Sequence, residues 1–212
     1  MPTQRACQLT MMYSKRTFPS ELALILAISG GEYSRALFDL SNRLSYVGCR
    51  EEALQAILEA VDLRRSLAAG HPATMQSLDH LSICLSDLGR REHALEAILE
   101  AVGLRRQLAA DHPAAFNAFL ASSLGNLSNH LSNFGYRGDA LAAILEALNL
   151  HRQLAADRPT AFNSVLANSL NNFSNCLSHL RRREHAVGVI LEAVHLRRQL
   201  EADCPCGSRN VP

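Results

Sequence analysis

The sequence has no tryptophan, few aromatic residues and almost no net charge. Its 212 residues are 48% hydrophobic but only 5% aromatic, and 21 Lys and Arg residues against 20 Asp and Glu residues leave a net charge of +1. A chain this apolar is not intrinsically disordered, and a dedicated nucleic-acid binder would carry a basic excess. The apolar residues are mostly Leu, Ala, Ile and Val. Because Leu and Ala are strong helix formers, the composition favours an all-α fold.

The sequence also lacks long hydrophobic runs and paired cysteines. No apolar run approaches the roughly 18 residues of a membrane span, so we expect none. The six cysteines are scattered, with no C-x-x-C pair. We therefore expect no disulfide framework, which fits a reducing, cytoplasmic compartment. Cys84 and Cys176 stand at apolar helical positions and are predicted to lie in the core.

One sequence pattern occurs four times. The segment REEALQAILEAVDLRR at 50–65 returns at 91–106, 137–152 and 183–198. Its first alanines are 41, 46 and 46 residues apart, namely Ala53, Ala94, Ala140 and Ala186. The prolines that close the repeats have the same spacing, namely Pro72, Pro113, Pro159 and Pro205. The predicted repeats are 33–72, 73–113, 114–159 and 160–203, in one helical domain at 20–203.

Short segments flank these repeats. Residues 20–29 predict a cap helix, and residues 1–19 and 204–212 are expected to be flexible ends. No further repeat follows the fourth, so one apolar side of its last helix would be uncovered. Repeat arrays usually carry a polar cap there. We therefore expect that the chain is a piece of a longer array, packs against a partner, or self-associates.

Each repeat is predicted to form two helices. Helix A carries Leu at helical spacing on one face and Ser, Asn, Asp and His on the other. Gly48, Gly89 and Gly135 are predicted to end it, and Arg181 in the fourth repeat predicts a strained or different turn. Helix B is apolar around most of its circumference and must be covered on two sides, as in a solenoid. Two residues are predicted to cap the longer copies of helix A, namely Asn117 and Asn163.

A second row of alanines follows the first by seven residues, and an isoleucine stands between the rows. With the segments LRRQLAADHP at 104–113 and SLGNLSN at 123–129, these rows resemble the tetratricopeptide repeat family, in its kinesin-light-chain variant. The resemblance covers about residues 33–203. It implies a right-handed superhelical solenoid of antiparallel helix pairs, with helix A lining a concave groove. A HEAT-type array has a similar repeat length, but the paired alanine rows favour the tetratricopeptide repeat.

No catalytic constellation is found in the sequence. There is no phosphate-binding loop, nucleophile elbow or His-Glu-x-x-His motif. His93 and His185 occupy equivalent positions, which indicates an architectural role. Cys204 and Cys206 lack nearby metal ligands. We therefore predict a protein that is not an enzyme and needs no cofactor or metal.

Basic residues recur in pairs in helix B, namely Arg64-Arg65, Arg105-Arg106, His151-Arg152 and Arg197-Arg198. Such a ladder could bind nucleic acid or an acidic partner. We favour the interpretation that these residues complement the helix dipole, balance neighbouring glutamates and cover apolar surface with their stems. The prediction is therefore that neither nucleic acid nor a membrane is a partner.

The polar face of helix A is the predicted binding site. The resemblance implies that its rows, especially asparagine, hold an extended peptide, and Asn can both donate to and accept from a peptide group. A merely solvated, duplicated surface is the other interpretation. The predicted groove residues are Asp39, Asn42, His80, Asn126, Asn129, Asn133, Asn172, Asn175 and His179.

The predicted function is a non-catalytic interaction scaffold that binds a peptide segment or partner protein in this groove. Few basic residues line the groove, so a neutral or mixed-charge peptide is favoured. The alternative is a structural or self-associating array module, as a piece of a larger multidomain signalling protein.

Overall fold

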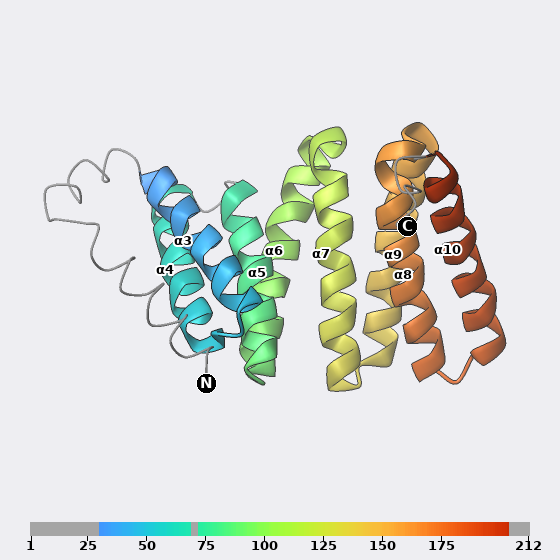
Figure 1. Cartoon of the computed structure of the whole chain (residues 1–212), viewed down its shortest axis with the longest axis horizontal. Helices are drawn as coiled ribbons and strands as arrows, with labels where there is room; N and C mark the ends of the chain where they lie inside the picture. The colour runs from blue at the N-terminus through green and yellow to red at the C-terminus, as the bar shows by residue number, and fades with distance from the viewer. Residues whose placement is uncertain (1–29, 69–71, 204–212) are drawn as a thin grey trace, which may run out of the picture. The chain divides into compact units, whose positions relative to one another are not determined.

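The computed structural model describes residues 30–68 and 72–203, and these residues form α-helices joined by short turns (Figure 1). The predicted cap helix at 20–29 and both predicted flexible ends lie outside the described residues. Within the described residues there is no strand, and no helix is long and apolar enough to cross a membrane. The helices are α3 (Gly30–Tyr46), α4 (Arg50–Ala68), α5 (Pro72–Asp87), α6 (Arg91–Asp111), α7 (Pro113–Phe134), α8 (Arg137–Asp157), α9 (Pro159–His179) and α10 (Arg183–Asp203).

The chain divides into two compact units, Met1–Leu104 and Arg105–Pro212. In the first unit α3 packs on α4 and α4 packs on α5. In the second unit α7 packs on α8, α8 on α9 and α9 on α10, while α7 also touches α9. The helix A positions are thus α3, α5, α7 and α9, and the helix B positions are α4, α6, α8 and α10. The predicted all-α fold of paired helices is confirmed.

The two alanine rows lie in the core. All eight alanines are buried, namely Ala53, Ala60, Ala94, Ala101, Ala140, Ala147, Ala186 and Ala193. The isoleucine between them is fully buried in the first three repeats, at Ile57, Ile98 and Ile144. Small residues at these positions allow close packing of the helices, as the sequence predicted.

A serine ties helix A to helix B in three of the repeats. Ser41 Oγ donates to the Ala53 carbonyl at 2.7 Å, Ser128 Oγ to Ala140 at 2.8 Å, and Ser174 Oγ to Ala186 at 2.9 Å. The three serines are buried. Each hydrogen bond satisfies a hydroxyl that burial would otherwise penalise, so serine is a structural residue here.

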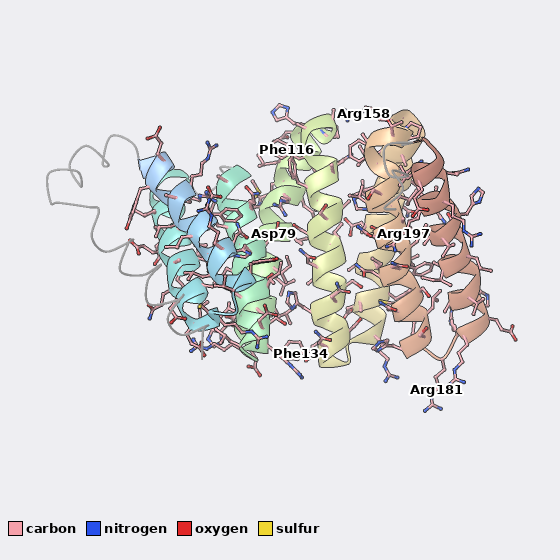
Figure 2. The ribbon with its side chains drawn as sticks, in the orientation of Figure 1. Asp79, Phe116, Phe134, Arg158, Arg181 and Arg197 are labelled. Carbon is pink, nitrogen blue, oxygen red and sulfur yellow. The ribbon has the colours of Figure 1, made fainter. Side chains whose placement is uncertain are left out.

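The turn after helix A has one backbone shape in every repeat. Gly48, Gly89 and Gly135 have positive φ, and Arg181 adopts φ 60° in the fourth repeat. Figure 2 shows Arg181 at the turn between α9 and α10. The Arg181 amide donates to the Ser178 carbonyl, as the Gly135 amide donates to Ser132. The fourth turn therefore has the same shape as the others and is strained, because an L side chain rarely adopts positive φ.

The predicted N-caps are wrong. Helices α7 and α9 begin at Pro113 and Pro159, and their N-cap residues are His112 and Arg158, which make no side-chain capping hydrogen bond. Proline is well suited to the first helical position because its φ is already helical and it has no N–H to satisfy. Asn117 and Asn163 therefore lie within these helices and do not cap them.

The described cysteines differ in state. Cys84 and Cys176 are buried free thiols, which confirms their predicted place in the core. Cys49 is buried and disulfide-bonded. The expectation that the chain has no disulfide framework did not foresee this bond, because the sequence context of Cys49 after a turn glycine contains no sign of a cross-link.

Candidate functional site

Most of the predicted groove residues fall in the second compact unit, on α7 and α9. We call the surface formed by six of them the amide face, namely Asn126, Asn129 and Asn133 on α7 and Asn172, Asn175 and His179 on α9. The three positions on α9 correspond to the three on α7 in the neighbouring repeat. Because α7 and α9 are in contact, the two rows belong to adjacent helices.

The outer part of the amide face is open to solvent. Asn129 and Asn133 of α7 and Asn175 and His179 of α9 are exposed, whereas Asn126 and Asn172 are half-buried. Asn172 lies against α7, since a methyl group placed on Gly125 would be 3.9 Å from its amide nitrogen. The Asn172 side chain therefore lies beside the buried Gly125 of α7, at a distance that a methyl group at this position would also allow.

The side chains of the amide face make no hydrogen bonds within residues 30–68 and 72–203. Each asparagine keeps a free carbonyl oxygen and a free NH₂ group. A peptide backbone presents both a donor and an acceptor at each residue. The amide face can therefore hydrogen-bond a peptide in either chain direction.

The other predicted groove residues lie in the first compact unit. Asp39 and Asn42 are exposed on α3, and the Asp39 carboxylate acts electrostatically on Arg64. His80 on α5 is half-buried, with its Nε2 atom 3.1 Å from Ser41 Oγ and its ring edge-on to Phe38. The structure thus places His80 in the contact between α5 and α3.

His80 also lies beside a cysteine, which raises the question of a nucleophilic pair. The His80 Nε2 atom is 3.6 Å from Cys84 Sγ. Burial lowers the pKa of His80 and raises the pKa of the Cys84 thiol. A reactive cysteine needs the opposite shifts, with a stabilised thiolate next to a protonated histidine. The pair is therefore suited to packing and not to nucleophilic catalysis.

The recurring basic residues divide into two structural roles. The first residue of each pair is buried in the first three repeats, at Arg64, Arg105 and His151. Arg64 donates to the Ala73 carbonyl at 2.7 Å and to Ser77 Oγ, both on the next helix A. His151 Nδ1 lies 2.7 Å from Ser169 Oγ, again on the next helix A. These residues join successive repeats.

In the first three repeats the second basic residue forms an ion pair with a glutamate of the next helix B. These pairs are Arg65–Glu100, Arg106–Glu146 and Arg152–Glu192, with an N–O distance of 3.1 Å in the last. The interpretation that the basic residues balance glutamates is consistent with this geometry, although each partner belongs to the following repeat.

Sequence analysis missed one apolar residue on the amide face. Phe119 precedes Asn126 by seven residues, two helical turns, and its side chain is 55% exposed. The Arg105 guanidinium carbon lies 5.9 Å from the centre of its ring. The helical spacing to Asn126 is the signal that could have identified it. Phe119 adds an aromatic surface at one end of the amide face.

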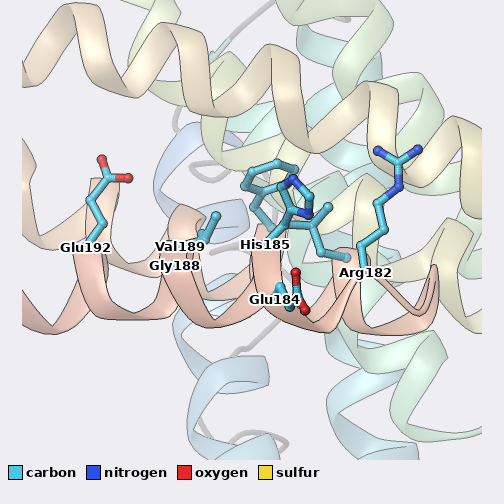
Figure 3. A pocket seen from close by; sticks show the side chains of 8 residues that line it. Arg182, Glu184, His185, Gly188, Val189 and Glu192 are labelled. Atoms are coloured by element: carbon cyan, nitrogen blue, oxygen red, sulfur yellow. The ribbon is translucent and has the colours of Figure 1, made fainter.

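A separate pocket lies between α9 and α10 (Figure 3). Its volume is about 560 Å³, and Gly188 is one of its lining residues, at a position where the earlier repeats carry Gln55, Glu96 and Ala142. None of the predicted groove residues lines it. Its lining is Phe173, Leu177, Arg182, Glu184, His185, Gly188, Val189 and Glu192. This residue set contains no nucleophile beside a base, and among the described residues no cluster of His, Cys, Asp and Glu could hold a metal ion.

Two family models match the chain. A tetratricopeptide repeat model matches residues 74–114, and a model described as anaphase-promoting complex subunit 5 matches residues 9–69 and 110–170. The chain belongs to the tetratricopeptide repeat family. Members of this family generally act as non-catalytic scaffolds for protein–protein interaction. No curated protein matches the sequence.

Solved structures of this fold are similar to the chain. BtubC (BKLC) from P. vanneervenii has a TM-score of 0.69 at 15% identity, with 84% of this chain and 66% of that chain covered. The nearly identical TPR-like repeats of a kinesin light chain from Podosopora anserina have a TM-score of 0.56 at 18% identity, with 93% and 88% covered. MamA has a TM-score of 0.57 at 13% identity, with 86% and 87% covered. The resemblance to kinesin-light-chain-type tetratricopeptide repeats is confirmed.

Proposed function

We propose that this protein is a non-catalytic scaffold that binds an extended segment of a partner protein on the amide face of α7 and α9. The observation that carries the proposal is the set of asparagines on two adjacent helices that have no hydrogen-bonding partner within the described residues. An extended peptide across these helices would satisfy them. The proposal identifies this face with the concave groove implied by the tetratricopeptide repeat.

The amide face also indicates what kind of segment it would bind. Its asparagines are neutral, and His179 is its one ionisable side chain. Phe119 offers an aromatic surface for an apolar side chain of the ligand, since its ring is largely exposed. We therefore expect a peptide of low net charge with one large apolar residue at the end that meets Phe119.

The first compact unit has a counterpart of this face. Asn42 and Asp39 on α3 are exposed and would contact a ligand. His80 holds α5 against α3 through Ser41 and contributes to the proposed site by positioning these helices. Ligand contacts in this unit are therefore assigned to α3.

The basic residues of helix B are assigned to structure and not to nucleic acid. Arg64 and His151 are buried between successive helices, and Arg65, Arg106 and Arg152 are bound to glutamates. Few of these positive charges remain for phosphate contacts. An affinity for DNA or RNA that falls steeply with salt would contradict this assignment.

The proposed compartment is the cytoplasm. Its support is that Cys84 and Cys176 are free thiols in the core, whereas the disulfide-bonded Cys49 is unusual where thiols are kept reduced. Cell fractionation checks this assignment, which predicts enrichment with cytosolic markers; recovery with secreted proteins would contradict it.

The experiment that tests the binding site is a selection from a random peptide library followed by affinity measurements. Peptides that carry tryptophan can be followed by fluorescence without background, because the protein has no tryptophan. Each Asn→Ala change on the amide face removes hydrogen bonds to the peptide. We expect Asn129→Ala combined with Asn175→Ala to weaken binding about tenfold or more.

The matched control is Asn149→Ala, on the exposed side of α8. It removes the same chemical group from a helix B surface and should leave affinity unchanged. If the double variant on the amide face binds selected peptides as tightly as the parent, the site assignment is wrong.

A further inference from the structure

Helix α10 exposes two valines at positions that are more buried in the other helix B copies. Val194 is 38% exposed, whereas the equivalent Val61, Val102 and Leu148 are 1–2% exposed. Val187 is 56% exposed, whereas the equivalent Leu54 is 4% exposed and Leu95 and Leu141 are half-buried. Leu191, between the two valines, is 61% exposed, and this position is also exposed in the other copies, at 38–49% for Leu58, Leu99 and Leu145. The side of α10 that bears these residues is therefore uncovered.

These residues form one straight stripe with a charge at each end. We call it the α10 stripe, and it consists of Glu184, Val187, Leu191, Val194 and Arg198, spaced three, four, three and four residues apart. This average spacing of 3.5 residues keeps an apolar seam in contact with a second helix. All five side chains are exposed.

The charged ends of the stripe have no ion-pair partner in the part of the chain that the structure describes. Arg198 occupies the position at which Arg65, Arg106 and Arg152 each bind a glutamate. No such glutamate reaches Arg198, and no cation pairs with Glu184. The stripe therefore presents one free acid and one free base.

The stripe is complementary to itself when it is reversed. Glu184 and Arg198 each stand seven residues from Leu191, on opposite sides. An antiparallel second copy centred on Leu191 would bring each Glu184 opposite the partner copy's Arg198 and place the valines over the partner's apolar residues. A parallel copy would instead place like charges opposite each other, which is unfavourable.

We infer that the α10 stripe binds a second copy of this chain, as an antiparallel helix pair about a twofold axis near Leu191. Twofold, self-complementary contacts are the commonest form of self-association. The inference extends the self-association alternative considered from the sequence, and it does not depend on peptide binding by α7 and α9. Because the stripe spans only about four helical turns, the dimer is weak and depends on concentration.

The first test is sedimentation equilibrium over a wide range of protein concentration. The apparent mass should rise from the 23.2 kDa of the monomer towards twice that value. Leu191→Glu should keep the chain monomeric, and its exposed position makes loss of folding an unexpected result that circular dichroism would reveal. The matched control is Leu99→Glu, at the equivalent exposed position of α6, which should still dimerise.

The second test uses opposite charge changes. Arg198→Glu alone places two acids opposite each other, and Glu184→Arg alone places two bases opposite each other, so each variant should associate about tenfold more weakly. An equimolar mixture of the two variants should recover the association of the parent, because both contacts become attractive. A parent chain that stays monomeric, or a mixture that does not recover association, would overturn the inference whether or not the amide face binds peptides.

Discussion

Arg181 adopts the positive φ of the repeated turn, which is unfavourable for a residue that has a side chain. The other three turns use glycine, whose missing Cβ makes positive φ accessible at little cost. Arg181 adopts the same region with a side chain, at a cost of roughly 1–2 kcal/mol. The comparison of repeats in the sequence predicted either a strained or a different turn, and the positive φ of Arg181 favours the strained one.

Replacing Arg181 with glycine should therefore stabilise the protein. We expect Arg181→Gly to raise the free energy of unfolding by about 0.5–1 kcal/mol, after the extra chain entropy of glycine is subtracted. Urea denaturation followed by circular dichroism measures this change. The reciprocal control, Gly135→Arg, should destabilise by about 1 kcal/mol, and a loss of stability in Arg181→Gly would refute the account of the turn.

Buried histidines make folding stability sensitive to pH. Burial lowers the pKa of His80, His130 and His151 below the ordinary value near 6.5. In acid the unfolded chain binds protons before the folded chain does, so stability is complete above about pH 6.5 and falls as the pH drops towards the folded-state values. His151 stands where other repeats carry arginine. Because its buried ring is neutral and must gain a charge in acid, the contact between α8 and α9 becomes sensitive to acid.

His151→Gln should reduce this sensitivity, because glutamine can still hydrogen-bond to Ser169 but does not titrate. We expect the loss of unfolding free energy between pH 7.5 and pH 5.5 to be smaller in the variant than in the parent. Urea denaturation at the two pH values measures it. His93→Gln, at an exposed position, is the control. Equal losses in His151→Gln and the parent would contradict the role of His151.

At the scale of helices, two rows of alanine determine how closely helix A and helix B pack. Ala140 and Ala147 are buried on α8, and Ser128 of α7 donates to the Ala140 carbonyl. The seven-residue spacing predicted these contacts because it places both alanines on one face of a helix. The N-caps were not predicted, because a proline at the first helical position replaced the expected side-chain cap.

A large side chain in the alanine row should overpack this interface. We expect Ala140→Leu to destabilise the protein by about 1–3 kcal/mol, because the neighbouring helix cannot move away without loss of other contacts. Thermal or urea denaturation checks the value. Ala142→Leu, exposed on the same helix, should have little effect. If Ala140→Leu and Ala142→Leu lower the free energy of unfolding equally, the alanine row does not provide close packing at Ala140.

At the scale of the whole molecule, the repeat determined most of what could be predicted. Periodic apolar residues predicted the helix pairs, and repeated asparagines indicated the amide face, because both patterns are local in sequence. The sequence predicted that the arginines balance glutamates, but it did not predict that the partner belongs to the following repeat, as in Arg65–Glu100. That choice of partner depends on how far one helix is displaced along its neighbour. The same holds for the pocket at Gly188 and for the exposure of Phe119, which depend on what neighbouring helices leave uncovered.

The central claim is that the asparagines of α7 and α9 bind a peptide backbone, and side-chain amide NMR tests it most directly. A peptide selected for binding should shift the NH₂ signals of Asn129 and Asn175 and leave the signal of Asn149 on α8 unchanged. Shifts at Asn149 with none at Asn129 and Asn175 would contradict the account, because the ligand would then lie on the helix B surface.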